Sequence, residues 1–145
     1  MSNSQQPPMP PDENSPFDDT LGLVFTELTP DGARGQLEVQ PKLLQPNGIV
    51  HGGVYCSIVE SMASVPAYLW FDAQTGGGAG SGGNVVGVNN NTDFLRAVST
   101  GTVHAVSTPI HRGRSQQLWS VVITDGTDRT VARGQVRLQN LAPRD

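Results

Sequence analysis

The residues with the clearest chemical potential lie in one stretch, residues 45–70, of the 145-residue chain. An apolar run in this stretch contains a single ionisable carboxylate, Glu60. A charged side chain on an apolar helix incurs a desolvation cost unless a neighbouring group requires it. Three serines, Ser57, Ser61 and Ser64, stand at spacings that would place them beside Glu60 in a narrow polar stripe. Such a stripe indicates either a ligand site or a seam between subunits.

Gly52 and Gly53 stand where this helix would begin. The first N–H groups of a helix have no internal acceptor and carry partial positive charge, and glycine lets a ligand approach them closely. A carbonyl oxygen that becomes an oxyanion during acyl transfer would be stabilised there, where the loss of one donor costs about 3 kcal/mol. Glu60, two helical turns further on, could act on the same carbonyl as a nucleophile or as a base for water. The residues alone favour this role and a structural role for Glu60 about equally.

The three histidines, His51, His104 and His111, do not match a metal-binding signature such as H-E-x-x-H, so we expect no metal. His51 precedes the glycine pair and could cap the helix, orient a substrate, or do both. The single cysteine, Cys56, excludes an internal disulfide and a multi-cysteine metal site. No cofactor is expected.

A basic turn, Arg112-Gly113-Arg114-Ser115, lies between two expected strands. Its two guanidinium groups, hydroxyl and glycine could hold a phosphate, although a basic hairpin turn is also common without a ligand. A second glycine-rich segment, residues 76–83, matches the dinucleotide pattern G-x-G-x-x-G only formally. It follows a helix and precedes a strand, the reverse of the required order, so we interpret it as a connecting loop.

Charge and composition narrow the class of protein. The chain has nine Lys and Arg against thirteen Asp and Glu, and residues 1–20 account for the whole net charge of −4. No lysine-rich run suggests nucleic-acid binding, and no apolar run is long enough for a membrane span, so we expect a soluble, cytoplasmic protein. Residues 1–15 are too polar and proline-rich to order themselves and are predicted to be a disordered tail. A charged fraction of 15%, below the typical ~25%, suits an oligomer subunit.

The remaining pattern predicts a single domain over residues 16–145. Apolar positions spaced by three and four residues predict a helix over 54–70, which Pro66 should kink or end. Before it we expect a short helix, a hairpin within 22–40 and a loop at 42–50; after it we expect strands at 84–95, 101–111, 116–124 and 130–141. This order predicts an α+β domain in which a curved antiparallel sheet wraps around one long central helix.

These residues resemble a known family. The run NGIVHGG at 47–53, with Glu60 seven residues later and Ser64 after it, resembles the signature of hotdog-fold acyl-CoA thioesterases. The most similar subgroup includes phenylacetate-pathway and 4-hydroxybenzoyl-CoA thioesterases. Residues 87–96 resemble the family's strand after the helix, and His111-Arg112-Gly113-Arg114 resembles its His-x-Gly-Arg turn. The similarity spans roughly residues 20–140.

Carried over residue by residue, the resemblance implies a catalytic set. Gln45 would place the thioester, Gly52 would supply the oxyanion hole, and Glu60 would be the catalytic carboxylate. His51 would lie beside the glycines, and Ser64 would assist water or the carboxylate. Together with the polar stripe and the basic turn, the candidates for substrate binding are Gly53, Ser61, Asn91, His111, Arg112, Arg114 and Ser115.

The resemblance also implies an acyl-CoA substrate, with coenzyme A as part of the substrate rather than a cofactor. It implies a homodimer at least, with a homotetramer expected, in which Glu60 of one chain works with groups of its partner. Two alternatives stay open. One is an acyl-CoA-binding module without turnover; the other, ranked last because Glu60 has no histidine partner on its helix, is a hotdog dehydratase or hydratase.

Overall fold

The computed structural model describes residues 15–75 and 83–143, which form two helices, a short 3-10 turn and one sheet. The expected N-terminal tail, apart from Ser15, and most of the glycine-rich segment lie outside these residues. In chain order the elements are α1 Pro16–Leu21, β1 Leu23–Thr29, β2 Gly32–Glu38, the 3-10 turn η1 Pro41–Leu43, α2 Gly52–Gln74, β3 Asn84–Phe94, β4 Thr102–Arg112, β5 Gln116–Thr124 and β6 Thr130–Leu141.

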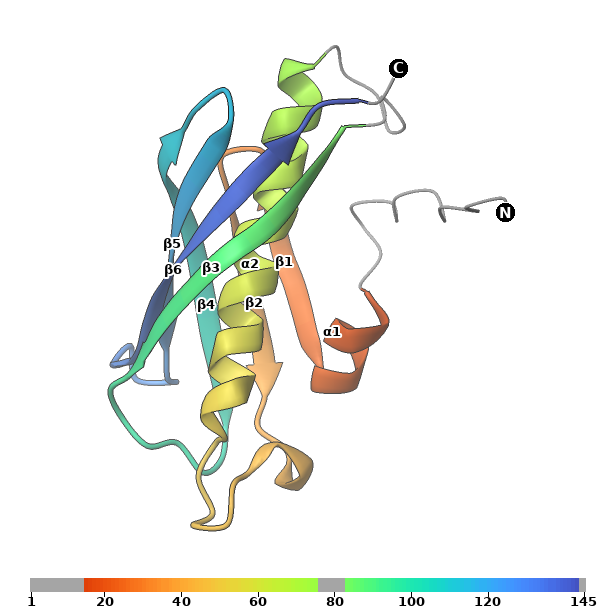
Figure 1. Ribbon diagram of the computed structural model, residues 1–145. Helices are drawn as coiled ribbons and strands as arrows, with labels where there is room; N and C mark the ends of the chain where they lie inside the picture. Colours follow the sequence, from red (N-terminus) through yellow and green to blue (C-terminus); the bar gives the residue numbers. More distant parts are fainter. Residues whose placement is uncertain (1–14, 76–82, 144–145) are drawn as a thin grey trace.

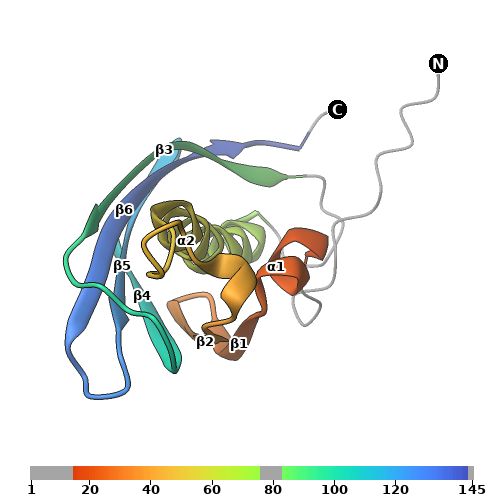
Figure 2. The same cartoon turned by 90° about the horizontal axis from the view of Figure 1, so that it is seen from below.

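The sheet has six strands in the order β1-β2-β4-β5-β6-β3, and every neighbouring pair is antiparallel. It curves around α2, which lies in its concave face (Figure 1). The view from below shows the same helix enclosed by the sheet on one side and flanked by α1 (Figure 2). The predicted α+β architecture is therefore confirmed. One edge of the sheet is β3, the strand that follows the central helix in sequence.

Helix α1 is the short helix expected before the first strand, and it leads directly into β1. Ser15, which the sequence places in the tail, caps this helix by accepting the Asp18 N–H at 3.1 Å. Gly22 ends the helix with a φ of 85°, a left-handed conformation that glycine adopts at low cost. Asp18 itself is buried and accepts a hydrogen bond from the Ser61 hydroxyl at 2.7 Å, which fastens α1 to α2.

Helix α2 is longer than the apolar spacing predicts, because it begins at Gly52 and ends at Gln74. The helix continues beyond Pro66, so of the two effects expected of this proline, a kink or an end, the end does not occur. The proline only removes one backbone donor, and the tight packing of the surrounding turns outweighs that loss. The side chains that anchor it are fully buried and include Val59, Met62, Ala63 and Ala67.

Close packing between helix and sheet depends on glycine at two strand positions. A Cβ on Gly134 of β6 would lie 2.9 Å from a Val59 methyl and 2.6 Å from the Thr92 hydroxyl. A Cβ on Gly35 of β2 would lie 2.9 Å from the Met62 sulfur. Any larger residue would push the helix away from the sheet. In the described part of the chain, no helix has the length and apolar character of a membrane span.

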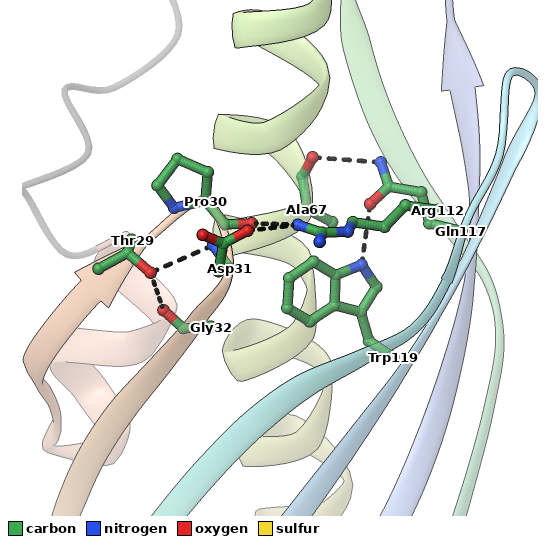
Figure 3. Close-up of polar contacts among 8 residues, drawn as sticks. All are labelled: Thr29, Pro30, Asp31, Gly32, Ala67, Arg112, Gln117 and Trp119. Carbon is green, nitrogen blue, oxygen red and sulfur yellow. Dashed lines mark hydrogen bonds and ion pairs between the residues drawn. The ribbon is translucent and has the colours of Figure 1, made fainter.

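A buried polar network connects the middle of α2 to the turn between β4 and β5. Gln117, fully buried, donates to the Ala67 carbonyl at 3.2 Å and accepts from the Trp119 indole at 2.8 Å (Figure 3). It also donates to the Asn140 Oδ1 at 2.8 Å. Asn140 in turn donates to the carbonyls of Gly113 and Arg114 at 3.0 and 3.1 Å. Buried polar groups with satisfied partners favour one arrangement of the elements they join. The basic turn is therefore held against the core.

Arg112 joins the same region to the β1–β2 turn. Its guanidinium donates to the Asp31 carboxylate at 2.8 Å and to the Pro30 carbonyl at 3.1 Å (Figure 3). It also lies over the indole rings of Trp70 and Trp119, at 5.4 and 5.9 Å from the centroids. Cation–π contact and an ion pair act together here.

We predict that Arg112→Gln lowers the free energy of unfolding by about 1–2 kcal/mol, because it removes the ion pair and both indole contacts. Urea unfolding monitored by tryptophan fluorescence measures the change. The matched control is Arg34→Gln, which removes an exposed pair with Glu27 and should cost less than about 0.5 kcal/mol. Equal losses in the two variants would contradict a packing role for Arg112.

Candidate active site

The carboxylate of Glu60 lies between α2 and the edge strand β3. Its Oε2 accepts a hydrogen bond from the Asn90 side-chain amide at 3.1 Å. Its Oε1 lies against the backbone of Gly87, so closely that a Cβ at that position would overlap it. Glu60 is half-buried, in contrast to its neighbour Val59, which is completely buried. Glu60, the only acid of the apolar stretch, thus has a hydrogen-bond donor in Asn90 and room for its carboxylate beside Gly87.

Asn90 is the site residue that the sequence reasoning missed. Its amide nitrogen also donates to the Cys56 carbonyl at 3.0 Å, and its amide oxygen accepts from the Thr92 hydroxyl at 2.7 Å. The sequence predicts Asn91 as the functional asparagine, but successive strand residues face opposite sides of a sheet. Because Asn90 faces the helix, Asn91 faces away from it. The run of three asparagines gave no signal as to which one meets Glu60.

The start of α2 carries the other half of the proposed chemistry. His51 caps the helix, since its Nδ1 accepts the Gly53 N–H at 2.8 Å, and the Val54 N–H bonds the His51 carbonyl at 2.9 Å. These bonds occupy the N–H groups of Gly53 and Val54, which follow Gly52 in the first turn. The N–H of Gly52 has no acceptor among the described residues. A Cβ on Gly52 would lie 2.5 Å from the ring of Phe94, so a larger residue here would displace that ring.

A pocket of ≈ 310 Å³ opens beside Gly52. Its walls come from the loop before α2, the first turn of the helix and the end of β3: Gln45, Ile49, Val50, Gly52, Tyr55, Phe94, Leu95, Arg96 and Ala97. Tyr55 packs against Phe94 with ring centroids 6.0 Å apart, and burial raises the pKa of its phenol. The loop is ordered by its own backbone bonds, including Gln45 N–H to the Ile49 carbonyl at 2.8 Å. Gln45 thus lines the pocket that contains the free N–H.

The serines of the predicted stripe have different roles. Ser57 donates to the Gly53 carbonyl at 2.7 Å, and Ser61 donates to Asp18, so both hydroxyls are occupied within the chain. Ser64 lies one helical turn after Glu60 and therefore on the same face of α2. It is half-buried and remains the hydroxyl placed to meet a group near the carboxylate.

The candidates from the basic turn separate into inner and outer groups. Arg112 is held by Asp31 and the two indoles, whereas Arg114 and Ser115 are exposed. His111 is also exposed, and with Asn91 it borders a second, polar hollow of ≈ 420 Å³. Its remaining lining residues are Asn89, Gln116, Gln117, Leu118, Gln135 and Arg137. The structure therefore brings His111 and Asn91 together, but on the face of the sheet away from Glu60.

Helix geometry separates the two chemical groups within one chain. Glu60 lies eight positions after Gly52 along α2, which corresponds to about 12 Å of helix rise. A carbonyl that accepts the Gly52 N–H is therefore out of reach of Glu60 of the same chain. Over the two described ranges, no cluster of three or more His, Cys, Asp or Glu is arranged to hold a metal ion.

Comparisons with known proteins identify the family of the chain. Residues 47–132 match the model of the thioesterase superfamily. The chain is 60% identical over 144 residues to a Mycobacterium tuberculosis protein that bears the name "Putative esterase Rv1847", with 99% of both chains covered. The solved structure of that protein has a TM-score of 0.83 and covers 90% of this chain and 100% of its own.

Two further relatives extend the comparison. The chain is 35% identical over 109 residues to the proofreading thioesterase EntH of Cronobacter sakazakii, covering 75% of this chain and 74% of that protein. The PaaI protein of the Escherichia coli phenylacetic acid degradation operon, at 19% identity, shares the fold, with a TM-score of 0.75 and coverage of 90% and 87%. The chain thus belongs to the thioesterase superfamily, has the hotdog fold, and is a thioester hydrolase.

Proposed function

We propose that the protein hydrolyses acyl-CoA thioesters, with the Gly52 N–H as oxyanion donor and Glu60 as the catalytic carboxylate. The observation that carries this proposal is that α2 presents two groups suited to acyl transfer: a free N–H beside a pocket at its start, and an accessible carboxylate two turns further on. A preorganised N–H directed at a developing oxyanion is among the strongest contributions to acyl-transfer catalysis.

In the reaction, the thioester carbonyl accepts the Gly52 N–H while Gln45 helps to place the acyl group in the pocket. Glu60 removes a proton from water, whose oxygen attacks the carbonyl carbon, or attacks that carbon itself to form an anhydride that water then cleaves. The C–S bond breaks, the thiolate takes up the proton, and the products are a carboxylic acid and coenzyme A. Ser64 and His51 would orient the attacking water and the carbonyl.

We further propose that each site is shared between two chains. Gly52 and Glu60 of one chain are separated by about 12 Å of helix rise, the length of roughly two helical turns. They therefore cannot meet at one carbonyl. Edge strand β3 offers unpaired backbone groups, and its Val86 and Val88 side chains are exposed. Antiparallel pairing of two β3 edges would place two α2 helices side by side in opposite directions, so that Glu60 of one meets Gly52 of the other. A dimer is thus the minimum, and a homotetramer would add contacts between dimers.

The nucleotide end of coenzyme A would meet the β4–β5 turn. Arg114 and Ser115 are exposed there, and the Asn140 bonds to the carbonyls of Gly113 and Arg114 hold the backbone of the turn in place. A guanidinium on a fixed backbone is suited to bind phosphate oxygens. Arg112 is excluded from this role by its contacts with Asp31, Trp70 and Trp119.

We predict that Glu60→Gln lowers kcat for acyl-CoA hydrolysis by at least about 10²-fold, because the amide can neither attack nor accept a proton from water. The measurement is thiol release from a panel of acyl-CoA substrates, trapped with a chromogenic disulfide. The control is Glu27→Gln, which removes an exposed carboxylate from β1 and should leave kcat unchanged. Unchanged turnover in Glu60→Gln would contradict the assignment, and saturable binding without thiol release by the wild-type protein would support the non-catalytic module instead.

Mixing two inactive variants tests the shared site. Gln45→Ala and Glu60→Ala dimers should each be nearly inactive, and their heterodimer should contain one complete site formed by Gln45 of one chain and Glu60 of the other. After mild denaturation and joint refolding, we expect activity to rise to about a quarter of the wild-type value, since half of the dimers are mixed and each has one of two sites. If the mixture has no more activity than its components, each site lies within one chain.

We predict that Arg114→Ala raises KM for an acyl-CoA at least about tenfold, but leaves KM for the N-acetylcysteamine thioester of the same acid unchanged, because only coenzyme A carries phosphates. Steady-state kinetics with both substrates provide the comparison. Arg129→Ala, which removes an exposed arginine paired with Asp125, is the matched control. Equal effects of Arg114→Ala on both thioesters would refute phosphate binding by this side chain.

A further inference from the structure

We infer that Thr92 and Asn90 form a hydrogen-bond relay on β3 that positions the Glu60 carboxylate for the attack on the thioester. The inference deepens the proposed function and rests on the catalytic role of Glu60. It concerns two side chains that lie on the strand facing the helix, neither of which belongs to the signature residues around Gly52 and Glu60.

The orientation of the Asn90 amide is determined by its neighbours. The Thr92 hydroxyl donates to the amide oxygen at 2.7 Å, and the amide nitrogen faces the helix. There it donates one hydrogen to Glu60 Oε2 at 3.1 Å and the other to the Cys56 carbonyl at 3.0 Å. The reverse orientation would place the amide oxygen against a carboxylate and a carbonyl and would lose both of those bonds, whereas the Thr92 hydroxyl could then accept a hydrogen bond from the amide nitrogen. The two acceptors on the helix therefore select the orientation in which Asn90 is a donor to Glu60, and the Thr92 hydroxyl, as a donor to the amide oxygen, holds the amide in that position.

The second bond of Asn90 ties the carboxylate to the helix backbone. Cys56 lies one turn before Glu60, and its carbonyl, which accepts the Glu60 N–H in a regular helix, uses its remaining lone pair for Asn90. The amide thus spans the backbone and the carboxylate of the same helical turn. With the Gly87 backbone against Oε1, this contact restricts the rotation of a flexible side chain. Catalysis by proximity requires this restriction, since a displacement of about 1 Å can cost 10²-fold in rate.

The charge of the partner also matters. Within the described residues Glu60 forms no ion pair, and its hydrogen-bond donor is a neutral amide. An arginine or lysine at position 90 would align the carboxylate, but the ion pair would neutralise its negative charge and make it a weaker nucleophile and base. A neutral donor aligns the carboxylate and leaves it free to attack or to accept a proton.

The relay is not required to hold β3 in the sheet. The strand pairs with β6 from Asn84 to Phe94, apart from one register shift between Gly87 and Asn89, and Asn90 lies opposite Val136 and Thr92 opposite Gly134. Asn90 is exposed, and hydrogen bonds of exposed polar side chains contribute little to the net stability of a fold. Loss of the Thr92 hydroxyl should therefore change catalysis rather than folding.

The test compares Thr92→Val, which removes the hydroxyl at constant shape, with Thr92→Ser, which keeps it. With an acyl-CoA that the wild-type protein hydrolyses, we expect Thr92→Val to lower kcat about tenfold with KM unchanged, and Thr92→Ser to stay within about twofold of the wild type. Asn90→Ala should lower kcat further, and adding Thr92→Val to it should have no additional effect, because Thr92 acts only through Asn90. Thr108→Val on the exposed face of β4 is the control for a threonine-to-valine change.

Three results would overturn the relay. They are an unchanged kcat in Thr92→Val, equal losses in the serine and valine variants, and additive losses in the double variant. These outcomes differ from failure of the proposed function, in which Glu60→Gln stays active or the wild-type protein hydrolyses no acyl-CoA. An active wild type, an inactive Glu60→Gln and an unaffected Thr92→Val would together reject the relay alone.

Discussion

The placement of one carboxylate on an enclosed helix is the constraint on which the rest of the structure depends. Val59 and Met62, the neighbours of Glu60 on α2, are completely buried, so the sheet must approach the helix closely on most sides. A charge in that setting is tolerated only where it meets a donor and keeps access to water. Edge strand β3 supplies both conditions through the missing side chain of Gly87 and the amide of Asn90. A central strand in the same place would seal the carboxylate from any substrate.

The same helix also fixes the spacing of the two groups that we propose to act on the thioester. A straight helix with about 1.5 Å of rise per residue cannot bring its first N–H and a side chain two turns later to one atom. The distance becomes useful when two helices lie antiparallel, because the start of one then lies beside the middle of the other. The exposed apolar side chains of β3 and the pocket beside Gly52 lie at the edge where such a pairing would form. Edge strand, helix length and site position are thus parts of one geometric solution.

Much of this fold follows from local sequence patterns, and the site follows from them only in part. The three-four spacing along residues 54–69 predicts the central helix, and strands β5 and β6 have the bounds that their alternation predicts. The role of Asn90 could not be predicted in this way. A register shift separates Gly87 from Asn89, and a shift of one residue reverses which side chains face the helix. Only the folded register shows that Asn90, rather than Asn91, meets Glu60.

The two arginines of the β4–β5 turn illustrate the same limit with a different cause. Both stand in a basic turn, and sequence spacing assigns them equally to phosphate binding. Arg112 instead finds two indole faces and a carboxylate, contributed by α2, β5 and the β1–β2 turn, which are distant in sequence. Buried hydrogen bonds then fix the backbone of the β4–β5 turn to the helix that carries Glu60. They run from the turn to Asn140, from Asn140 to Gln117, and from Gln117 to Ala67 of α2. The contacts of Arg112 anchor one side of the turn to the core. The Arg114 side chain, two residues later, extends from this anchored turn into solvent.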